Sequence, residues 1–212
     1  MKDAPKHRIP KALADEFVAS QKQGTLAAYA EDEFPRLSLL PFVKDGDLIE
    51  MHCVQLDPTF QALCLNPRVT FMVSDYLGTY PSDWVDPNDG GRGSTVFRAV
   101  SFDCMAEHHT DPTVVAAGLT RLLSVYEPGA PHGTIIDGNV YGARLRQLAL
   151  LRLKVVATQA KFKIGPPGVD ETSRRTNVAN QFRKRGQPGD AEAARWIDHY
   201  NELRRADGSW TV

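Results

Sequence analysis

The sequence predicts a mainly β protein, in which an antiparallel barrel carries helices packed against its outside. Two observations support this fold class. Short apolar runs follow one another through hairpin-length connections, and they do not alternate regularly with helices as in a doubly wound parallel sheet. Two longer runs, at residues 94–108 and 149–164, alternate apolar and polar residues with the period of two that is typical of strands.

The N-terminal half is expected to contain one helix followed by several strands. Pro10 opens an amphipathic helix, and Gly24 ends it. An Asp-Gly pair between two apolar runs predicts a hairpin turn, and Asp57 before Pro58 predicts the start of a short helix. Strands are expected at residues 25–30, 36–43, 47–55 and 68–75, and the short helix at 58–66.

The C-terminal half is expected to combine a long loop, two long strands and several helices. Residues 77–94 set aromatic residues among proline and glycine and predict the loop. In the first long strand the even-numbered residues share an apolar face, which also carries Arg98. In the second, Arg152 and Lys154 face one way and their leucine and valine neighbours the other. Helices are expected at 112–127, 138–149, 170–185 and 190–204.

The composition is that of a cytoplasmic globular protein. The 212 residues are enough for one domain with a substantial core, and a net charge of −1 argues against wholesale electrostatic binding to DNA or membrane. Cys53, Cys64 and Cys104 form no CxxC pair, which favours reduced thiols over a disulfide framework. No apolar leader opens the chain, and no run reaches membrane-spanning length. We therefore expect a cytoplasmic protein with no membrane partner.

Several common catalytic and metal-binding motifs are missing from the sequence. No G-x-G-x-x-G follows a strand and no G-x-x-x-x-G-K-[ST] occurs, so dinucleotide-binding folds and P-loop enzymes lose their main support. The loop sequence DPNDGGRG fails the spacing of a calcium loop, and no cysteine pair or H-E-x-x-H has zinc-site spacing. His108 and His109 are adjacent on a strand and point to opposite faces, so they cannot chelate together. We predict no metal site.

Arg98 is unusual because it lies on an otherwise apolar strand face. Burying a guanidinium costs free energy unless its charge is paired. Two kinds of partner are open at this point: an acid such as Asp103 or Glu107, or a bound anion such as phosphate.

Four stretches, taken in chain order, resemble the PaiB-type proteins. RLSLLPFVKDGDLIEMHCVQLDPTFQAL, residues 36–63, resembles the part of that family in which an HLP strand is followed by GHLARANPQW. GTYPSDWV, residues 78–85, is similar to the family's AYVSPSWY loop, and STVFRAV, residues 94–100, takes the place of its PTWNYAAV strand. AKFKIGPPGVDETSRRTNVANQFRKRG, residues 160–186, is similar to its GKWKLSQNRPEADRAGVIEGLRARG tail.

The resemblance implies a fold, a cofactor and an assembly. PaiB-type proteins belong to the FMN-binding split barrels that include the pyridoxamine 5'-phosphate oxidases, and these are typically homodimers with flavin at the subunit interface. The resemblance thus implies a Greek-key split β-barrel at residues 1–165 and a helical extension at 166–212 packed on the same domain. The implied cofactor is FMN, with another flavin, a deazaflavin or haem as alternatives. The implied cofactor-binding residues are Ser38, Leu39, Leu40, Pro41, His52, Cys53, Val54, Tyr80, Ser82, Trp84, Thr95, Arg98, Lys161 and Lys163.

Within that set, the resemblance assigns different roles to different strands. The strand that starts at Ser38 would face the isoalloxazine ring, and His52 and Cys53 would lie near the ribityl chain or phosphate. The chain departs from the family at three places: VFR (96–98) replaces WNY, GPP (165–167) replaces SQN, and glutamine replaces the arginine of HLARAN.

The remaining predicted contacts come from the loop and the last strand. Tyr80 and Trp84 would form a stackable wall for the ring, and the alternative for this pair is simple anchoring of the loop by core packing. Lys161 and Lys163 point to the same side of their strand and are predicted to meet the flavin phosphate.

The main functional hypothesis is a flavin-dependent oxidoreductase acting on a small-molecule substrate, in which the flavin carries the hydride chemistry. No residue stands out as a general acid or base, and His52 is the best titratable candidate. One alternative is a flavin-binding negative transcriptional regulator without catalytic turnover. Another is a haem-binding or haem-utilisation split-barrel protein with His108, His109 and His132 as candidate ligands.

The basic segment at residues 160–186 raises the question of nucleic acid as a partner. No helix-turn-helix is legible, and the sequence lacks the high isoelectric point of a nucleic-acid binder. The helix predicted here has Asp170 and Glu171 near its start and Arg183, Lys184 and Arg185 at its end, an order that suits the helix macrodipole. Nucleic acid is therefore the less favoured partner.

Overall fold

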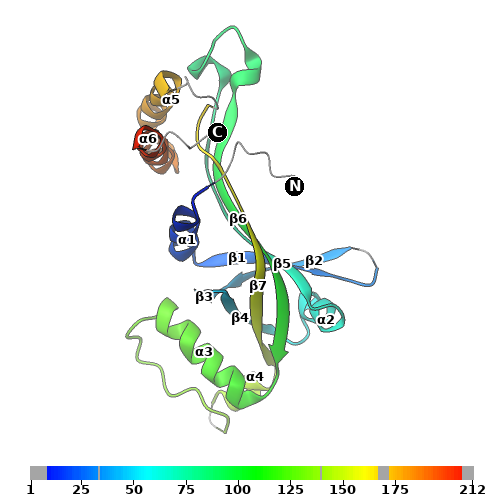
Figure 1. The fold of residues 1–212 in the computed structure, drawn as a ribbon. Helices are drawn as coiled ribbons and strands as arrows, with labels where there is room; N and C mark the ends of the chain where they lie inside the picture. Colours follow the sequence, from blue (N-terminus) through cyan, green and yellow to red (C-terminus); the bar gives the residue numbers. More distant parts are fainter. Residues whose placement is uncertain (1–8, 33, 139, 167–171, 207–212) are drawn as a thin grey trace. The chain divides into compact units, whose positions relative to one another are not determined.

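The computed structural model describes residues 9–32, 34–138, 140–166 and 172–206. Within them, seven strands form one antiparallel sheet in the order β2-β1-β5-β6-β7-β4-β3, flanked by six α-helices (Figure 1). The strands are β1 (Gln23–Tyr29), β2 (Pro35–Pro41), β3 (Val43–Asp45), β4 (Leu48–Val54), β5 (Arg68–Tyr80), β6 (Ser94–His109) and β7 (Leu148–Lys163). The helices are α1 (Lys11–Ser20), α2 (Pro58–Leu65), α3 (Pro112–Tyr126), α4 (Gly142–Leu145), α5 (Thr172–Arg185) and α6 (Asp190–Ala206), with the short 3-10 helices η2 (Ser82–Trp84) and η3 (Gly90–Arg92). The predicted mainly β, antiparallel architecture with flanking helices is confirmed.

The chain divides into two compact units, and we describe each by itself. The sheet unit comprises residues 15–73 and 101–159, and the tail unit comprises the described residues within 1–14, 74–100 and 160–212. The long strands β5, β6 and β7 contribute residues to both units. The domain boundary predicted at residue 165 stays a prediction.

The core of the sheet unit follows from the alternation of side chains along its strands. The β4–β7 ladder places Ile49 opposite Leu153, and the β1–β5 ladder places Leu26 opposite Phe71; all four side chains are fully buried. Directly opposite residues of an antiparallel pair point to the same face, so these rows stack into one apolar interior. Burying each such side chain contributes about 1.5–3 kcal/mol.

Two glycines of the sheet unit serve different purposes. Gly46 has φ +53° in the two-residue connection between β3 and β4, which confirms the predicted Asp-Gly turn. Gly24 does not end a helix as predicted, because α1 already ends at Ser20 and Gly24 lies in β1. A Cβ atom there would lie 2.3 Å from the ring of Phe71, so the glycine permits close packing rather than a helix stop.

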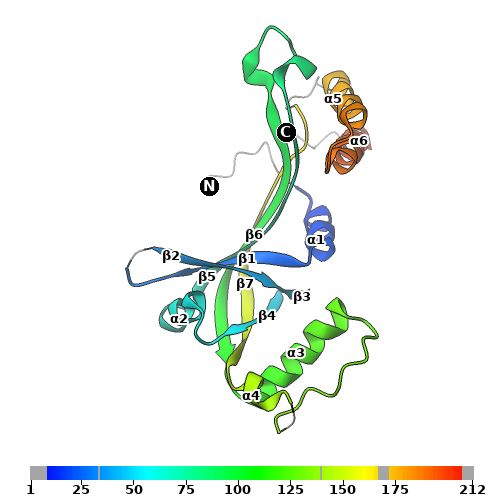
Figure 2. The same ribbon diagram turned by 180° about the vertical axis from the view of Figure 1, so that it is seen from behind.

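A second apolar cluster in the sheet unit lies between α3 and the start of β7. Asp111 caps α3 by accepting a hydrogen bond from the Thr113 amide at 2.9 Å, which confirms the helix predicted there. Val115 packs with Leu150 in this cluster, and a Cβ at Gly118 would lie 2.3 Å from the Leu150 side chain. Figure 2 shows α3 beside β4 and α4 next to one end of α3. The helix expected at 138–149 is reduced to the four residues of α4.

The tail unit is held together by the packing of α5 against α6, which lie side by side in Figures 1 and 2. Val178 and Phe182 of α5 and Ile197 of α6 are fully buried. Gly189, just before α6, has φ +89°, and a Cβ there would lie 2.4 Å from the Leu77 carbonyl oxygen. Among the described residues, no helix has the length and apolar character needed to cross a membrane.

Candidate functional site

The predicted cofactor-binding residues fall into two sets, one in each unit. The set in the sheet unit lies on β2 and β4: Ser38, Leu39, Leu40, Pro41, His52, Cys53 and Val54. The set in the tail unit lies on β5, η2, β6 and β7: Tyr80, Ser82, Trp84, Thr95, Arg98, Lys161 and Lys163.

β2 presents a backbone edge and two distinct faces. Among the described residues it is an edge strand of the sheet, so the backbone N–H and C=O groups on one of its sides face no neighbouring strand of the ladder. The side chains of Leu39 and Pro41 are exposed, whereas Ser38 and Leu40 are half-buried on the opposite face, towards α2. An edge of this kind can bond the polar rim of a planar ligand.

The hydroxyl of Ser38 is committed to the start of α2. Its Oγ donates to Asp57 Oδ1 at 3.0 Å and lies 2.7 Å from Thr59 Oγ1. Asp57 also accepts from the Thr59 amide at 2.7 Å and so caps the helix. Helix N-termini attract anions, but the Asp57 carboxylate already occupies this one. A ligand phosphate could bind here only by displacing that carboxylate.

Neighbouring residues of β4 face opposite ways. Cys53 points into the core, and burial, with Asp57 and Cys64 nearby, raises the pKa of its thiol to about 12, so it stays protonated and unreactive. His52 and Val54 point the other way. The Nδ1 atom of His52 is buried without a hydrogen-bond partner in the described part of the chain, and burial lowers the pKa of this imidazole. A neutral ring with an unsatisfied nitrogen, at a cost of about 1–3 kcal/mol, is suited to receiving a bond from a ligand.

An exposed apolar face extends across β2, β1 and β5 in the sheet unit. Leu39 and Met72 lie in one row on either side of Thr25, because Thr25 is opposite both in the two ladders. Leu37 occupies the next row. The exposed fractions of Leu37, Leu39 and Met72 are 65%, 60% and 40%, which is high for side chains of this kind.

The aromatic residues predicted to stack on a flavin pack against α5. Tyr80 is 1% exposed, and the rings of Tyr80 and Trp84 approach that of Phe182 edge-on, with centroids 6.3 and 5.3 Å away. The backbone oxygen of Trp84 accepts a hydrogen bond from Asn177 Nδ2 at 2.6 Å. These contacts anchor the loop to α5. They agree with the alternative to flavin stacking, in which Tyr80 and Trp84 hold the loop by core packing. A stacking role towards a flavin stays a prediction.

The remaining polar residues of the tail-unit set lie on partly buried surfaces. Ser82, Thr95, Lys161 and Lys163 are all half-buried. The Lys161 ammonium lies 5.8 Å from the centroid of the Phe97 ring, a cation–π contact. Their predicted contacts with a cofactor stay predictions.

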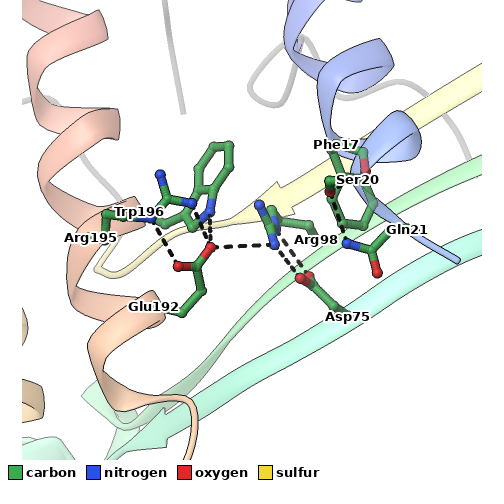
Figure 3. Close-up of polar contacts among 8 residues, drawn as sticks. All are labelled: Phe17, Ser20, Gln21, Asp75, Arg98, Glu192, Arg195 and Trp196. Atoms are coloured by element: carbon green, nitrogen blue, oxygen red, sulfur yellow. Dashed lines mark hydrogen bonds and ion pairs between the residues drawn. The ribbon is translucent and has the colours of Figure 1, made fainter. Parts of the chain in front are cut away.

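Arg98 is held by two carboxylates and an aromatic ring, as Figure 3 shows. Only 5% of the residue is exposed. Its Nε donates to Asp75 Oδ1 at 3.1 Å and its Nη2 to the second oxygen of the same carboxylate, while Glu192 Oε1 lies 3.9 Å away. The guanidinium carbon lies 4.2 Å from the centroid of the Trp196 ring. Its charge is therefore compensated within the tail unit.

Arg98 pairs with an acid, as one of its two alternatives expected, but the two acids named for that role were wrong. Asp103 is an odd-numbered residue of β6 on the exposed face, where it accepts a hydrogen bond from Thr70, and Glu107 lies on that face as well. Asp75 comes from β5, the neighbour of β6 in the sheet. Strand pairing was not legible in the sequence, so the partner strand could not be identified. The phosphate role of Arg98 stays a prediction.

The arginines at the end of the basic segment are neutralised by α6. Arg183 pairs with Asp198, and Arg185 binds both oxygens of Asp190, with Nη2 to Oδ1 at 2.6 Å and Nε to Oδ2 at 2.9 Å. The hydrogen bonds from Arg185 lower the pKa of the Asp190 carboxyl. The acids predicted at the helix start, 170 and 171, lie outside the described residues.

Two buried polar clusters were not anticipated from the sequence. Arg175 is fully buried, and its Nε donates to Asn201 Oδ1 at 2.6 Å and its Nη1 to the Pro166 carbonyl at 3.2 Å, which ties the end of β7 to α6. The sequence feature that could have revealed this burial is the helical spacing of Arg175 from the apolar residues Val178 and Phe182, which places it on the inner face of α5.

The second cluster centres on Glu50 in the sheet unit. Glu50 is 8% exposed, and its carboxylate accepts two hydrogen bonds of 2.7 Å from Arg121 and one of 2.9 Å from Arg152 Nε. The hydrogen bonds from Arg121, and then the one from Arg152, lower the pKa of Glu50. An acid within an apolar strand could have indicated this cluster in the sequence, but no residue spacing identified Arg121 as the partner of Glu50.

The histidines considered as haem ligands have varied surroundings. His108 contacts the Phe60 ring edge-on, and its Nε2 lies 3.9 Å from Cys64 Sγ. His132 is exposed, with Nδ1 3.2 Å from the Gly133 carbonyl oxygen. In the described ranges, no group of three or more His, Cys, Asp or Glu side chains is placed to hold a metal ion.

Comparison with known proteins identifies the fold. No protein-family model and no curated protein sequence matches the chain. Among solved structures, it is similar to the flavocytochrome Anf3 from Azotobacter vinelandii, at TM-score 0.62 and 19% identity over 78% of this chain and 73% of that one. It is also similar to the FAD and haem binding protein from Mycobacterium smegmatis, at TM-score 0.60 and 18% identity over 78% of each chain. A conserved hypothetical protein from Mycobacterium tuberculosis matches at TM-score 0.54 and 19% identity, over 76% of this chain and 90% of that one.

These likenesses confirm the predicted split-barrel fold class. Identities of 18% and 19% show a shared fold and not a shared activity.

Proposed function

We propose that the chain is a flavin-binding split-barrel protein and that it acts as a flavin-dependent oxidoreductase on a small molecule. The observation that carries this proposal is its fold likeness to a flavocytochrome and to an FAD and haem binding protein. The four sequence stretches that resemble PaiB-type proteins support the same conclusion. FMN is the form of flavin that we propose.

The residues of the sheet unit suit the ring of such a cofactor. The outer edge of β2 presents backbone donors and acceptors that no described strand of the sheet adjoins, and the buried Nδ1 of His52 can accept a hydrogen bond from the ligand. The exposed leucines of β2 add apolar surface that excludes water. A bound flavin supplies hydride transfer, and these residues orient it. Because Asp57 fills the N-terminus of α2, the phosphate is expected to bind elsewhere.

The exposed apolar face of β2, β1 and β5 supports a further part of the proposal, a homodimer. A face with Leu37, Leu39 and Met72 this exposed is stabilised by covering it with a second copy. We expect Leu39→Asp to convert dimer to monomer in light scattering coupled to gel filtration. Leu65→Asp is the matched control, because Leu65 is 64% exposed but lies on α2, and it should leave the dimer intact. A monomeric parent protein would contradict the proposal.

The regulator alternative is less well supported by the tail unit. DNA binding relies on basic side chains that are free to meet phosphates, and both arginines at the end of α5 are paired with acids of α6. A cytoplasmic location is retained as part of the proposal.

The visible absorption spectrum of freshly purified protein tests the proposed function. We expect flavin bands, release of FMN on denaturation as identified by mass, and bleaching of the bands when a nicotinamide or reduced flavin donor is added. A colourless protein that FMN cannot reconstitute would overturn the proposal. A Soret band on haem titration without any flavin band would favour the haem alternative instead.

A further inference from the structure

A hollow in the sheet unit lies outside the predicted cofactor-binding set. Its volume is about 320 Å³, and it is lined by Asp45, Asp47, Leu48, Glu107, Arg152 and Lys154. Because β6, β7, β4 and β3 are neighbours in that order, the two cations on β7 lie between the acid of β6 and the acids of the β3–β4 turn. The hollow thus has a cationic centre with acidic flanks.

Arg152 is held in position before any ligand arrives. Its Nε donates to Glu50 Oε1 at 2.9 Å, and Glu50 is fixed in turn by two hydrogen bonds of 2.7 Å from Arg121. Within the described residues, the two terminal nitrogens of Arg152 make no hydrogen bond. One edge of the guanidinium is therefore fixed and the other is available, and such an edge matches the two oxygens of a carboxylate.

Lys154 and the β3–β4 turn complete the arrangement. In the β4–β7 ladder Lys154 is opposite Leu48, and Arg152 is opposite Glu50, so both cations project from the same face of β7. The Val155 amide donates to the Asp47 carbonyl at 2.9 Å, which holds the turn against β7.

The opposite charges around the hollow do not neutralise one another. In the described part of the chain, Arg152 pairs only with Glu50, and Lys154 forms no ion pair with Asp45, Asp47 or Glu107. Where cations and carboxylates line a hollow without touching one another, a single ligand that carries both a negative and a positive charge can bind both kinds of side chain.

We propose that this hollow binds a small zwitterion of the amino-acid type. Arg152 and Lys154 bind its carboxylate, and the flanking acids bind its ammonium. The lining carries three carboxylates against two cations, which leaves one negative charge in excess. An amino acid with a second ammonium, such as L-lysine, therefore complements it best.

Titration of the ¹⁵N-labelled full chain with L-lysine, followed by NMR, tests this site independently of flavin binding. We expect saturable shifts of the Leu48 and Lys154 amides. Arg152→Met should weaken binding about tenfold or more, as expected for loss of a charged hydrogen bond. Arg146→Met is the matched control, because this arginine pairs with Asp137 elsewhere in the sheet unit, and it should bind L-lysine as the parent does.

Two further ligands and one further variant make the outcome decisive. Glutarate carries only carboxylates and cadaverine only ammonium groups, so both should bind more weakly than L-lysine. Lys154→Met should also weaken binding, and it spares the fold because Lys154 is exposed and forms no ion pair with any described residue. The proposal is overturned by the absence of shifts at about 10 mM L-lysine, by equal binding of glutarate or cadaverine, or by a Lys154→Met protein that binds like the parent.

Discussion

Two arginines of the tail unit and three polar groups of the sheet unit differ in whether other residues of the protein satisfy them. In the tail unit, Arg98 and Arg185 are each bound by a carboxylate and lie close to aromatic rings. In the sheet unit, the terminal nitrogens of Arg152, the ammonium of Lys154 and the Nδ1 of His52 have no partner among the described residues. A charge that is satisfied internally stabilises structure, whereas an unsatisfied polar group is available to a ligand. We therefore propose that Arg98 and Arg185 of the tail unit are structural and that ligands bind in the sheet unit.

The largest expected effect is on the free energy of unfolding, for a substitution of Arg98 in the tail unit. Arg98→Met leaves Asp75 and Glu192 near each other without their shared cation, and removing one partner of a buried pair should cost about 3 kcal/mol in the free energy of unfolding. Arg92→Met, which removes an exposed pair with Asp89, should cost less than about 1 kcal/mol. Urea denaturation of both variants measures the difference.

The same Arg98→Met variant also tests whether this residue binds phosphate. If its role is structural, folded Arg98→Met protein should retain the flavin affinity of the parent. A large loss of affinity in protein that is still folded would assign the phosphate role to Arg98 and weaken the contrast between the units.

A smaller effect is expected at the start of α2. Asp57→Ala removes both a helix cap and the partner of Ser38, so we expect a loss of about 2 kcal/mol. Asp111→Ala removes only the cap of α3 and should cost about 1 kcal/mol. Equal losses in thermal and urea unfolding would show that the Ser38 bond contributes nothing.

The smallest effect concerns pH. The folded-state pKa of Glu50 lies below its ordinary value of 4.5, so its ion pairs stabilise the fold above that pH and are lost as pH falls through the lowered pKa. The difference in unfolding free energy between the parent and Glu50→Gln should therefore shrink as the solution is acidified below 4.5. A constant difference for Glu50→Gln would contradict the assignment.

The sequence supported the fold better than it supported the site. Alternation in 94–108 predicted which residues of β6 face the core, and the Asp-Gly turn was found where expected. In β7 the prediction was right for Leu151 and Leu153, but Leu150 and Phe162 are also buried, although they share the parity of Arg152 and Lys154. Contacts that depend on strand order could not be predicted, as the pairing of Arg98 with Asp75 illustrates. The prediction that Gly24 ends a helix failed for a related reason. This glycine permits the close approach of the Phe71 ring, and Phe71 is distant in sequence.

Flavin affinity in two matched histidine variants tests the central claim most directly. His52→Gln alters the unsatisfied imidazole of the sheet unit, and His199→Gln alters an imidazole of the tail unit that packs against Trp196. In absorbance titrations with FMN, we predict about tenfold weaker binding for His52→Gln, the effect of losing one buried hydrogen bond, and parental affinity for His199→Gln. Parental affinity in His52→Gln, or a greater loss in His199→Gln, would contradict the assignment of the binding role to the sheet unit.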